Sequence, residues 1–397
     1  MKYFYMGFVV AFTCLKMSPA LADCTEVRST RIDYPDYVTS VQFNQDATRA
    51  LTGVPELMLW NAETARQIRP IGSPGASYSS ALLSPDGNFV LTTTRSVPTN
   101  ELHVLITPEL WNANTGALIA RFPSNNYKLS YPRFIAKFSA DSSVLGYGYV
   151  EFEDNGRHES HLEFLNTNNL TSLGHVENSE QPLINSITIS PDNRLMAASH
   201  HHPTANGVWD IRTGRKLVSL PNSTGEFTFS SDGSKLFAFG KDGGVEVRSA
   251  ADGNLIHTVA PGQRSVGQLR MHANRSSFAF FNRDTLETYD VSTGSLQRRY
   301  GLGQFASVGQ YFGESSFTYN FLAAGQILFA FNEFRAEVTN AQSSLLIGSV
   351  HIVPRDRPDL EIVGAAVDPL GTRMSLVKRA SSYWTFDVYA CGARATP

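Results

Sequence analysis

The fold is decided most clearly by residues 226–259, which read EFTFSSDGSKLFAFGKDGGVEVRSAADGNLIHTV. Four short runs rich in apolar residues, 226–229, 235–239, 245–249 and 255–259, are separated here by turn sequences. The large apolar residues recur at every second position, as Phe237 and Phe239 do, and this spacing places them on one face of a β-strand. The segment therefore predicts four antiparallel strands joined by tight turns.

A turn sequence of the type SPDG recurs along the whole chain. Its proline presets φ, its aspartate bonds to the turn backbone and its glycine or asparagine accepts a positive φ, so each copy favours a tight strand reversal. The copies are NQDA at 44–47, SPDG at 84–87, SADS at 139–142, SPDN at 190–193 and SSDG at 230–233, with weaker forms HANR at 272–275, LAAG at 322–325 and DPLG at 368–371.

A second motif follows each copy of the first. It reads LWN at 59–61 and 110–112, FLN at 164–166, VWD at 208–210, VRS at 247–249, TYD at 288–290, VTN at 338–340 and TFD at 385–387. Four short strands every 40 to 55 residues is the repeat length of a propeller blade. The paired motifs resemble the WD40 repeat family, although one repeat alone keeps the Trp-Asp pair, as Trp209-Asp210.

The resemblance covers residues 23–397 and implies an all-β chain forming a single β-propeller domain. Eight repeats predict eight four-stranded blades, and the weak seventh copy leaves seven blades as the alternative. A two-sheet sandwich is the competing architecture, and the eightfold spacing argues against it. Trp60, Trp111 and Trp209 recur at one position of the repeat, which predicts that they pack between blades.

The N-terminus has the order of a secretory signal peptide at residues 1–22. Lys2 precedes an apolar run from Phe8 to Leu15, and Ala20-Leu21-Ala22 forms a small-residue cleavage site. We expect a mature chain that begins at Asp23 and is secreted or periplasmic. A membrane anchor is the alternative, but the apolar run is shorter than the roughly 20 residues that span a bilayer, so we expect no membrane span.

The charge balance gives no support to a nucleic-acid partner. Without Lys2 and Lys16 the mature chain has 31 basic against 36 acidic residues, a net charge of −5. Nucleic-acid-binding domains usually carry a basic patch. We therefore expect a protein or peptide partner, and a monomeric chain.

The mature chain keeps two cysteines, Cys24 and Cys391, one near each end. In an oxidising compartment such a pair favours a disulfide. The last repeat supplies three strands, and an unmatched run at residues 26–32 precedes the first repeat. We expect this N-terminal strand to complete the last blade and close the ring, because open sheet edges invite aggregation.

Two neighbouring repeats carry insertions. The turn aspartate and the Trp position are 14 residues apart in the first repeat and 15 to 17 apart in the last five, but 25 and 24 apart in repeats two and three. The scaffold predicts that these insertions are long loops on the face that also carries the connections between blades. The partner-binding candidates on this face are Arg95, Glu101, Tyr127, Tyr131, Glu151, Glu153, Arg157, His158, His161, His200, His201 and His202.

The histidine and acid cluster has three interpretations: solvated polar loops, partner contact, or a metal site. On loops, His158 and His161 would have no rigid element fixing them, which argues against a metal. The chain lacks the common nucleophile, zinc-protease and phosphate-loop motifs. We expect a noncatalytic scaffold without cofactor. The alternative is an exported enzyme or cofactor binder, of the hydrolase, lactonase or dehydrogenase type, with a site in the axial channel.

Overall fold

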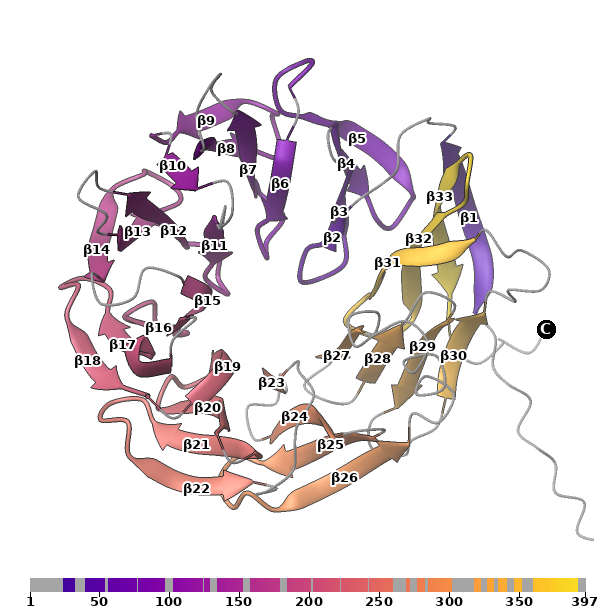
Figure 1. The fold of residues 1–397 in the computed structure, drawn as a ribbon. Coiled ribbons are helices and arrows are strands. Elements are labelled where there is room, and N and C mark those ends of the chain that lie inside the picture. Colours follow the sequence, from indigo (N-terminus) through magenta and orange to yellow (C-terminus); the bar gives the residue numbers. More distant parts are fainter. Residues whose placement is uncertain are drawn as a thin grey trace, which may run out of the picture.

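The fold is an eight-bladed ring of β-strands, seen in a computed structural model (Figure 1). The structure describes residues 24–32, 40–53, 56–76, 78–96, 103–123, 125–128, 134–152, 158–178, 184–200, 203–221, 223–241, 243–259, 269–271, 277–282, 285–301, 318–322, 327–331, 335–340, 346–351 and 360–391. Within these ranges the one helical element is a 3-10 turn, η1 (Pro203–Ala205), and no helix is long and apolar enough to cross a membrane. The predicted signal peptide lies outside the described residues.

Each blade is an antiparallel sheet whose strands follow one another from the centre of the ring outward (Figure 1). Blade one contains β2 (Val41–Phe43), β3 (Arg49–Thr52), β4 (Leu57–Asn61) and β5 (Arg66–Ile71). Blade two contains β6 (Tyr78–Leu83), β7 (Phe89–Ser96), β8 (His103–Asn112), β9 (Leu118–Arg121) and β10 (Asn125–Lys128), and blade three contains β11 (Ile135–Phe138), β12 (Val144–Phe152), β13 (His158–Asn166) and β14 (Ser172–Asn178). Blade four contains β15 (Ile184–Ile189), β16 (Leu195–His200), β17 (Gly207–Asp210) and β18 (Lys216–Ser219).

Blades five to eight repeat this order. Blade five contains β19 (Ser223–Phe229), β20 (Lys235–Gly240), β21 (Val245–Ser249) and β22 (Leu255–Val259), and blade six contains β23 (Arg270–Met271), β24 (Ser277–Asn282), β25 (Thr285–Asp290) and β26 (Leu296–Gly301). Blade seven contains β27 (Thr318–Leu322), β28 (Ile327–Phe331), β29 (Arg335–Asn340) and β30 (Leu346–His351). Blade eight contains β31 (Glu361–Val367), β32 (Arg373–Arg379), β33 (Trp384–Ala390) and β1 (Thr25–Ile32). The prediction of eight blades is confirmed, with blade eight built from both ends of the chain.

The first turn motif works through its serine and aspartate. In blade two, the Ser84 hydroxyl donates to Asp86 and accepts the backbone N–H of Phe89, while Asp86 also accepts the N–H of Asn88. Gly87 has a φ of 74°, a conformation that costs other residues energy. The same bonds hold Asp232 in blade five, where the Ser230 hydroxyl and the Ser234 N–H lower its pKa to about 2. The turn is thus built identically in different blades.

The recurring tryptophans fill the space between neighbouring blades. Trp60 is fully buried and packs on Trp384 and Phe386 of blade eight. Trp111 packs in one cluster with residues of blade one, such as Leu59. Each indole N–H is also satisfied, since Trp60 donates to the Thr52 hydroxyl at 2.8 Å and Trp111 makes the same bond to Thr92 at 2.9 Å. The core is therefore a ring of apolar layers between sheets.

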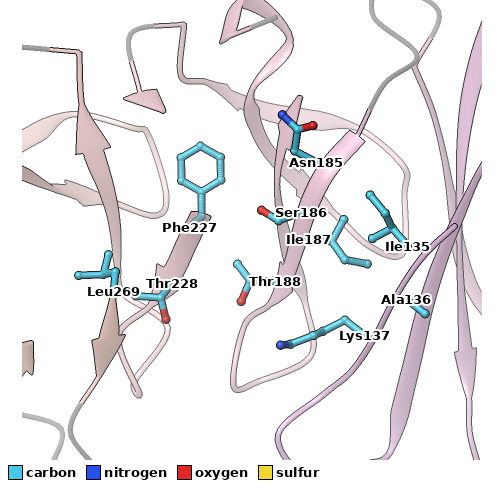
Figure 2. Close-up of a pocket in the computed structure, with 10 residues that line it drawn as sticks. All are labelled: Ile135, Ala136, Lys137, Asn185, Ser186, Ile187, Thr188, Phe227, Thr228 and Leu269. Carbon is cyan, nitrogen blue, oxygen red and sulfur yellow. The ribbon is translucent and has the colours of Figure 1, made fainter. Parts of the chain in front are cut away.

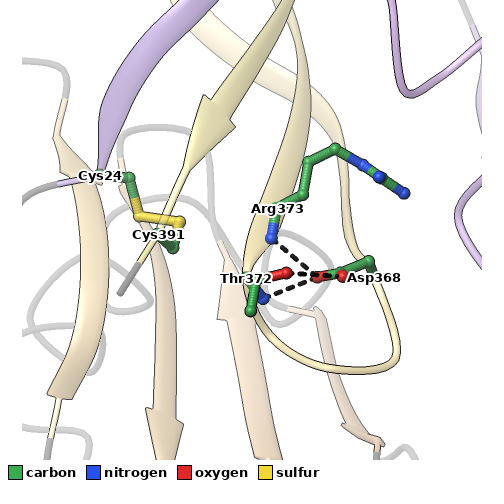
Figure 3. Close-up of a disulfide and its surroundings, with 5 residues drawn as sticks. All are labelled: Cys24, Asp368, Thr372, Arg373 and Cys391. Atoms are coloured by element: carbon green, nitrogen blue, oxygen red, sulfur yellow. Dashed lines mark hydrogen bonds between the residues drawn. A yellow bond between two sulfur atoms is a disulfide. The ribbon is translucent and has the colours of Figure 1, made fainter. Parts of the chain in front are cut away.

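The ring closes through β1, which pairs antiparallel with β33 from Thr25↔Ala390 to Ile32↔Trp384. At the end of this pair, Cys24 and Cys391 form a disulfide (Figure 3). The Cys391 N–H donates to the carbonyl of Thr372, which belongs to the turn of blade eight. Both the predicted closure and the predicted disulfide are confirmed.

The turn beside the disulfide uses an aspartate where blades two to five use serine and blade one uses Asn44. Asp368 accepts the backbone N–H groups of Thr372 and Arg373 at 2.7 Å each, and its second oxygen accepts the Thr372 hydroxyl (Figure 3). The bond to Arg373 matches the one from Phe89 to Ser84 in blade two. The weak motif DPLG therefore forms the same type of turn as the SPDG motif.

Candidate functional site

Blades two and three differ from the others in the length of their middle strands. The pairing of β7 with β8 extends to Ser96↔Leu105, and that of β12 with β13 extends to Phe152↔His158. In blade five the corresponding pair ends at Phe239↔Val245, after five pairs against eight and nine. The expectation of long loops around residues 95–101 and 151–161 was therefore wrong in part, because strand pairing continues into both insertions. They form extended β-hairpins.

The connection after β9 also contains a strand. β10 pairs with the beginning of β8, from Asn125↔Ile106 to Lys128↔His103, and lies against β12 of the next blade. Blade two is therefore five-stranded, with β9 and β10 sharing one edge of β8. Because β10 pairs with the hairpin end of β8, the connection between blades and the extended hairpin lie at the same face of the ring. We call this region, formed by the hairpin ends of blades two and three and by β10, the hairpin sector.

The predicted partner-binding residues divide into three groups. Arg95 is exposed on β7, Tyr127 lies on β10, Glu151 on β12 and His158 on β13. His161 and His200 are buried, so they belong to the framework beneath the surface. The remaining candidates lie outside the described residues: Glu101, Tyr131, Glu153, Arg157, His201 and His202.

His200 ends β16 and is held inside blade four. Its backbone N–H donates to the Asn206 side chain at 2.7 Å, and its ring lies 5.9 Å from that of Trp209. Burial, with the nearby charge of Lys216, lowers the pKa of His200 to about 4 although the Asn206 side chain opposes the shift. The imidazole is therefore neutral at physiological pH.

His161 is part of a cluster that the sequence interpretation missed. It lies on β13 rather than on a loop, directly opposite Glu177 of β14, while Glu163 is opposite His175. Side chains two positions apart share a face of a sheet, so the four residues gather on one face of blade three. The available signal was the repeated pattern His-x-Glu, at 161–163 and 175–177, on two strands joined by a short turn.

A cavity of about 330 Å³ opens on the inner strands of the ring. Figure 2 shows the side chains around it, which come from β11, β15, β19 and the residue before β23. Among its lining residues Lys137 alone has an ionisable side chain, beside hydroxyl groups such as Thr188 and Thr228 and apolar groups such as Phe227. The described lining therefore offers one charged group and several hydrogen-bonding groups.

Comparisons of the whole fold agree with this architecture. No model of a known protein family matches the chain, and no curated protein matches its sequence. Among solved structures, the C-terminal WD40 domain of Sif2 superposes with a TM-score of 0.61 at 14% sequence identity, over 94% of this chain and 100% of that chain. The chain has a WD40-like β-propeller fold.

A second structural comparison comes from protein design. The computationally designed Ika8 protein superposes with a TM-score of 0.62, again at 14% identity, over 92% of this chain and 99% of that chain. At this identity the likeness concerns the fold alone.

Proposed function

We propose that this WD40-like propeller is a noncatalytic scaffold that binds a protein or peptide through the hairpin sector and the adjoining end of blade four. The observation that supports this proposal most directly is the extension of the hairpins of blades two and three, whose strand pairing reaches Ser96↔Leu105 and Phe152↔His158. β10 pairs with the extended part of β8. Such ordered extensions present a surface with little entropy to lose on binding. The candidates Arg95, Tyr127, Glu151 and His158 lie on these strands.

We further propose that the protein acts outside the cytoplasm, as a monomer, after removal of residues 1–22. The disulfide between Cys24 and Cys391 supports this, because such bonds persist in oxidising compartments. Sequencing the N-terminus of the exported protein should give Asp23 as the first residue. Light scattering of the purified chain should give the monomer mass, and retention in the cytoplasm with two free thiols would contradict the localisation.

The partner surface is tested by shortening one hairpin without disturbing its sheet. Phe152 and His158 are paired, so replacing residues 153–157 with Asn-Gly leaves a two-residue turn of the kind that suits a hairpin. Crosslinking with mass spectrometry in the native compartment first names the partner. The purified partner should then bind the shortened variant at least about tenfold more weakly than wild type.

Blade five supplies the matched control. Residues 241–244 lie between β20 and β21, so replacing them with Asn-Gly keeps Gly240 and its pairing with Ser223 and tests whether any shortened hairpin weakens binding. This control should bind as wild type. Equal affinity for all three proteins would refute the assignment of the hairpin sector.

The cavity on the inner strands supports a second candidate, binding or conversion of a small ligand in the axial channel. Its volume of about 330 Å³ lies at the small end of known ligand sites. Thr188→Phe would fill the cavity from β15. A small-molecule panel that stabilises wild type but not this variant, with the partner still bound by both, would favour the axial site over the scaffold function.

A further inference from the structure

The four-residue cluster on blade three contains three metal-ligating groups that converge. One ligand atom from each of His161, His175 and Glu177, a ring nitrogen or a carboxylate oxygen, lies within 4.8 Å of the other two. His161 is buried, His175 is half-buried and Glu177 is exposed, so the cluster reaches from the protein interior to solvent. A small ion could therefore enter from the outside and meet fixed ligands.

Two of the three separations match the edges of a metal tetrahedron. Zinc binds histidine nitrogen and carboxylate oxygen at about 2.0–2.2 Å, so two ligands of one tetrahedral ion lie about 3.3–3.5 Å apart. The His161 Nδ1 is 3.4 Å from the His175 Nε2, and the latter is 3.2 Å from the Glu177 Oε1. The ligand atoms of His161 and Glu177 lie within 4.8 Å of each other, so the exposed Glu177 side chain has to move toward His161 for the three atoms to share one ion.

The surroundings orient these ligands. Glu163 contacts the Nδ1 of His175 at 2.7 Å and, since a carboxylate can only accept, orients that nitrogen as the donor, so that the Nε2 faces His161 and Glu177. Carboxylates bound to a ligating histidine in this way are common around zinc. Tyr149 stacks on the His161 ring, with centroids 5.0 Å apart. All these residues lie on paired strands, so the site is held by the sheet.

We propose that blade three binds one Zn²⁺ through His161, His175 and Glu177, with Glu163 as a positioning residue and water in the fourth position. Cysteine thiolates do not take part, because Cys24 and Cys391 are bonded to each other. The ion joins β13 to β14 and stabilises the outer edge of blade three. This site is independent of the proposed partner and of the axial cavity.

The test uses the untagged mature chain and ZnCl₂ in calorimetry and thermal unfolding. Wild type should bind one equivalent and unfold at a higher temperature, because a ligand of the folded state stabilises it. His175→Gln and Glu177→Gln should each weaken binding by more than about 100-fold, and Glu163→Gln by about 10–100-fold.

Two controls separate this site from incidental binding by other histidines. His257→Gln changes a histidine on the outer strand of blade five, and the double variant His201→Gln/His202→Gln removes most of the histidine run in blade four. Both should bind Zn²⁺ as wild type, and Co²⁺ should give the intense visible absorption of tetrahedral coordination in both. Absence of binding in wild type, or binding unchanged in both His175→Gln and Glu177→Gln, would overturn the proposal.

Discussion

Cys24 and Cys391 are 367 residues apart in the sequence, yet their Cα atoms lie 4.4 Å apart. The bond joins the chain just before β1 to the chain just after β33, beyond the last pair of that ladder, Thr25↔Ala390. The Cys24 N–H also donates to the carbonyl of Ser349 in blade seven. The closing strand is therefore fixed to both of the last two blades.

Removing this bond should destabilise the ring. Cys391→Ser frees the unfolded chain from a very long closed loop, and losing a native disulfide costs about 2–5 kcal/mol. The melting temperature measured by calorimetry should fall by several degrees. Wild type treated with reductant should show the same decrease.

The double variant Cys24→Ser/Cys391→Ser provides the control, because it has no bond left to reduce. Its melting temperature should match that of Cys391→Ser and should not respond to reductant. Mass spectrometry after alkylation should find no free thiol in the native wild-type protein, and two modified cysteines there would contradict the closure.

The bond from Trp60 to Thr52 should matter because both residues are buried beside the closing blade. Thr52→Val keeps the shape of the side chain but leaves the indole N–H without its acceptor, at a cost of about 1–3 kcal/mol. Denaturant unfolding should show this loss. Thr52→Ser, which keeps the hydroxyl, should be affected less, and an equal loss for both variants would assign the effect to packing instead.

The sequence was sufficient to predict the ring of blades, because the turn motif that recurs from blade to blade is formed by residues close together in the sequence. The turn formed by Ser84, Asp86 and Gly87 depends on residues within six positions of one another, so its pattern is visible without tertiary information. The unmatched strand at 26–32 and the two cysteines likewise pointed to one closure. DPLG at 368–371 was recognised only as a weak copy, although Asp368 takes over the role of serine.

The hairpin sector shows where sequence reasoning failed. The insertion lengths located the right blades, but length alone did not separate a loop from the paired strands ending at Phe152↔His158. The pairing of His161 with Glu177 and of Glu163 with His175 depends on the register across β13 and β14. A shift of that register by one residue would move the side chains of one strand to the other face, so the cluster required the structure.

Gly233 tests the turn chemistry in isolation. Its φ is 73°, and a Cβ there would have one neighbouring atom, the Cδ of Pro191, at an unstrained 3.8 Å. Gly233→Ala should therefore lower the free energy of unfolding by about 1–2 kcal/mol, which is the cost of placing a residue other than glycine at a positive φ. Gly233→Asn should cost less, because Asn193 already adopts a φ of 59° in the same turn of blade four. Equal unfolding free energies for Gly233→Ala and wild type would show that the turn can relax.

His200 predicts a specific acid sensitivity. Its pKa is lowered from 6.5 to about 4 in the folded chain, with burial as the largest cause. Below pH about 6.5 the unfolded chain gains a proton that the folded chain does not, so stability is lost as the pH falls toward 4. The shift corresponds to about 3 kcal/mol. Denaturant unfolding at pH 7.5, 6, 5 and 4 should reveal this decrease in wild type.

His200→Phe keeps a ring against Trp209 and preserves the backbone N–H that donates to Asn206, but it cannot titrate. Its unfolding free energy should therefore fall less between pH 6.5 and 4, whatever its value at pH 7.5. The variant His201→Gln/His202→Gln keeps His200 and should retain the wild-type slope. If His200→Phe kept the full slope while the double variant lost it, the acid sensitivity would belong to the neighbouring histidines.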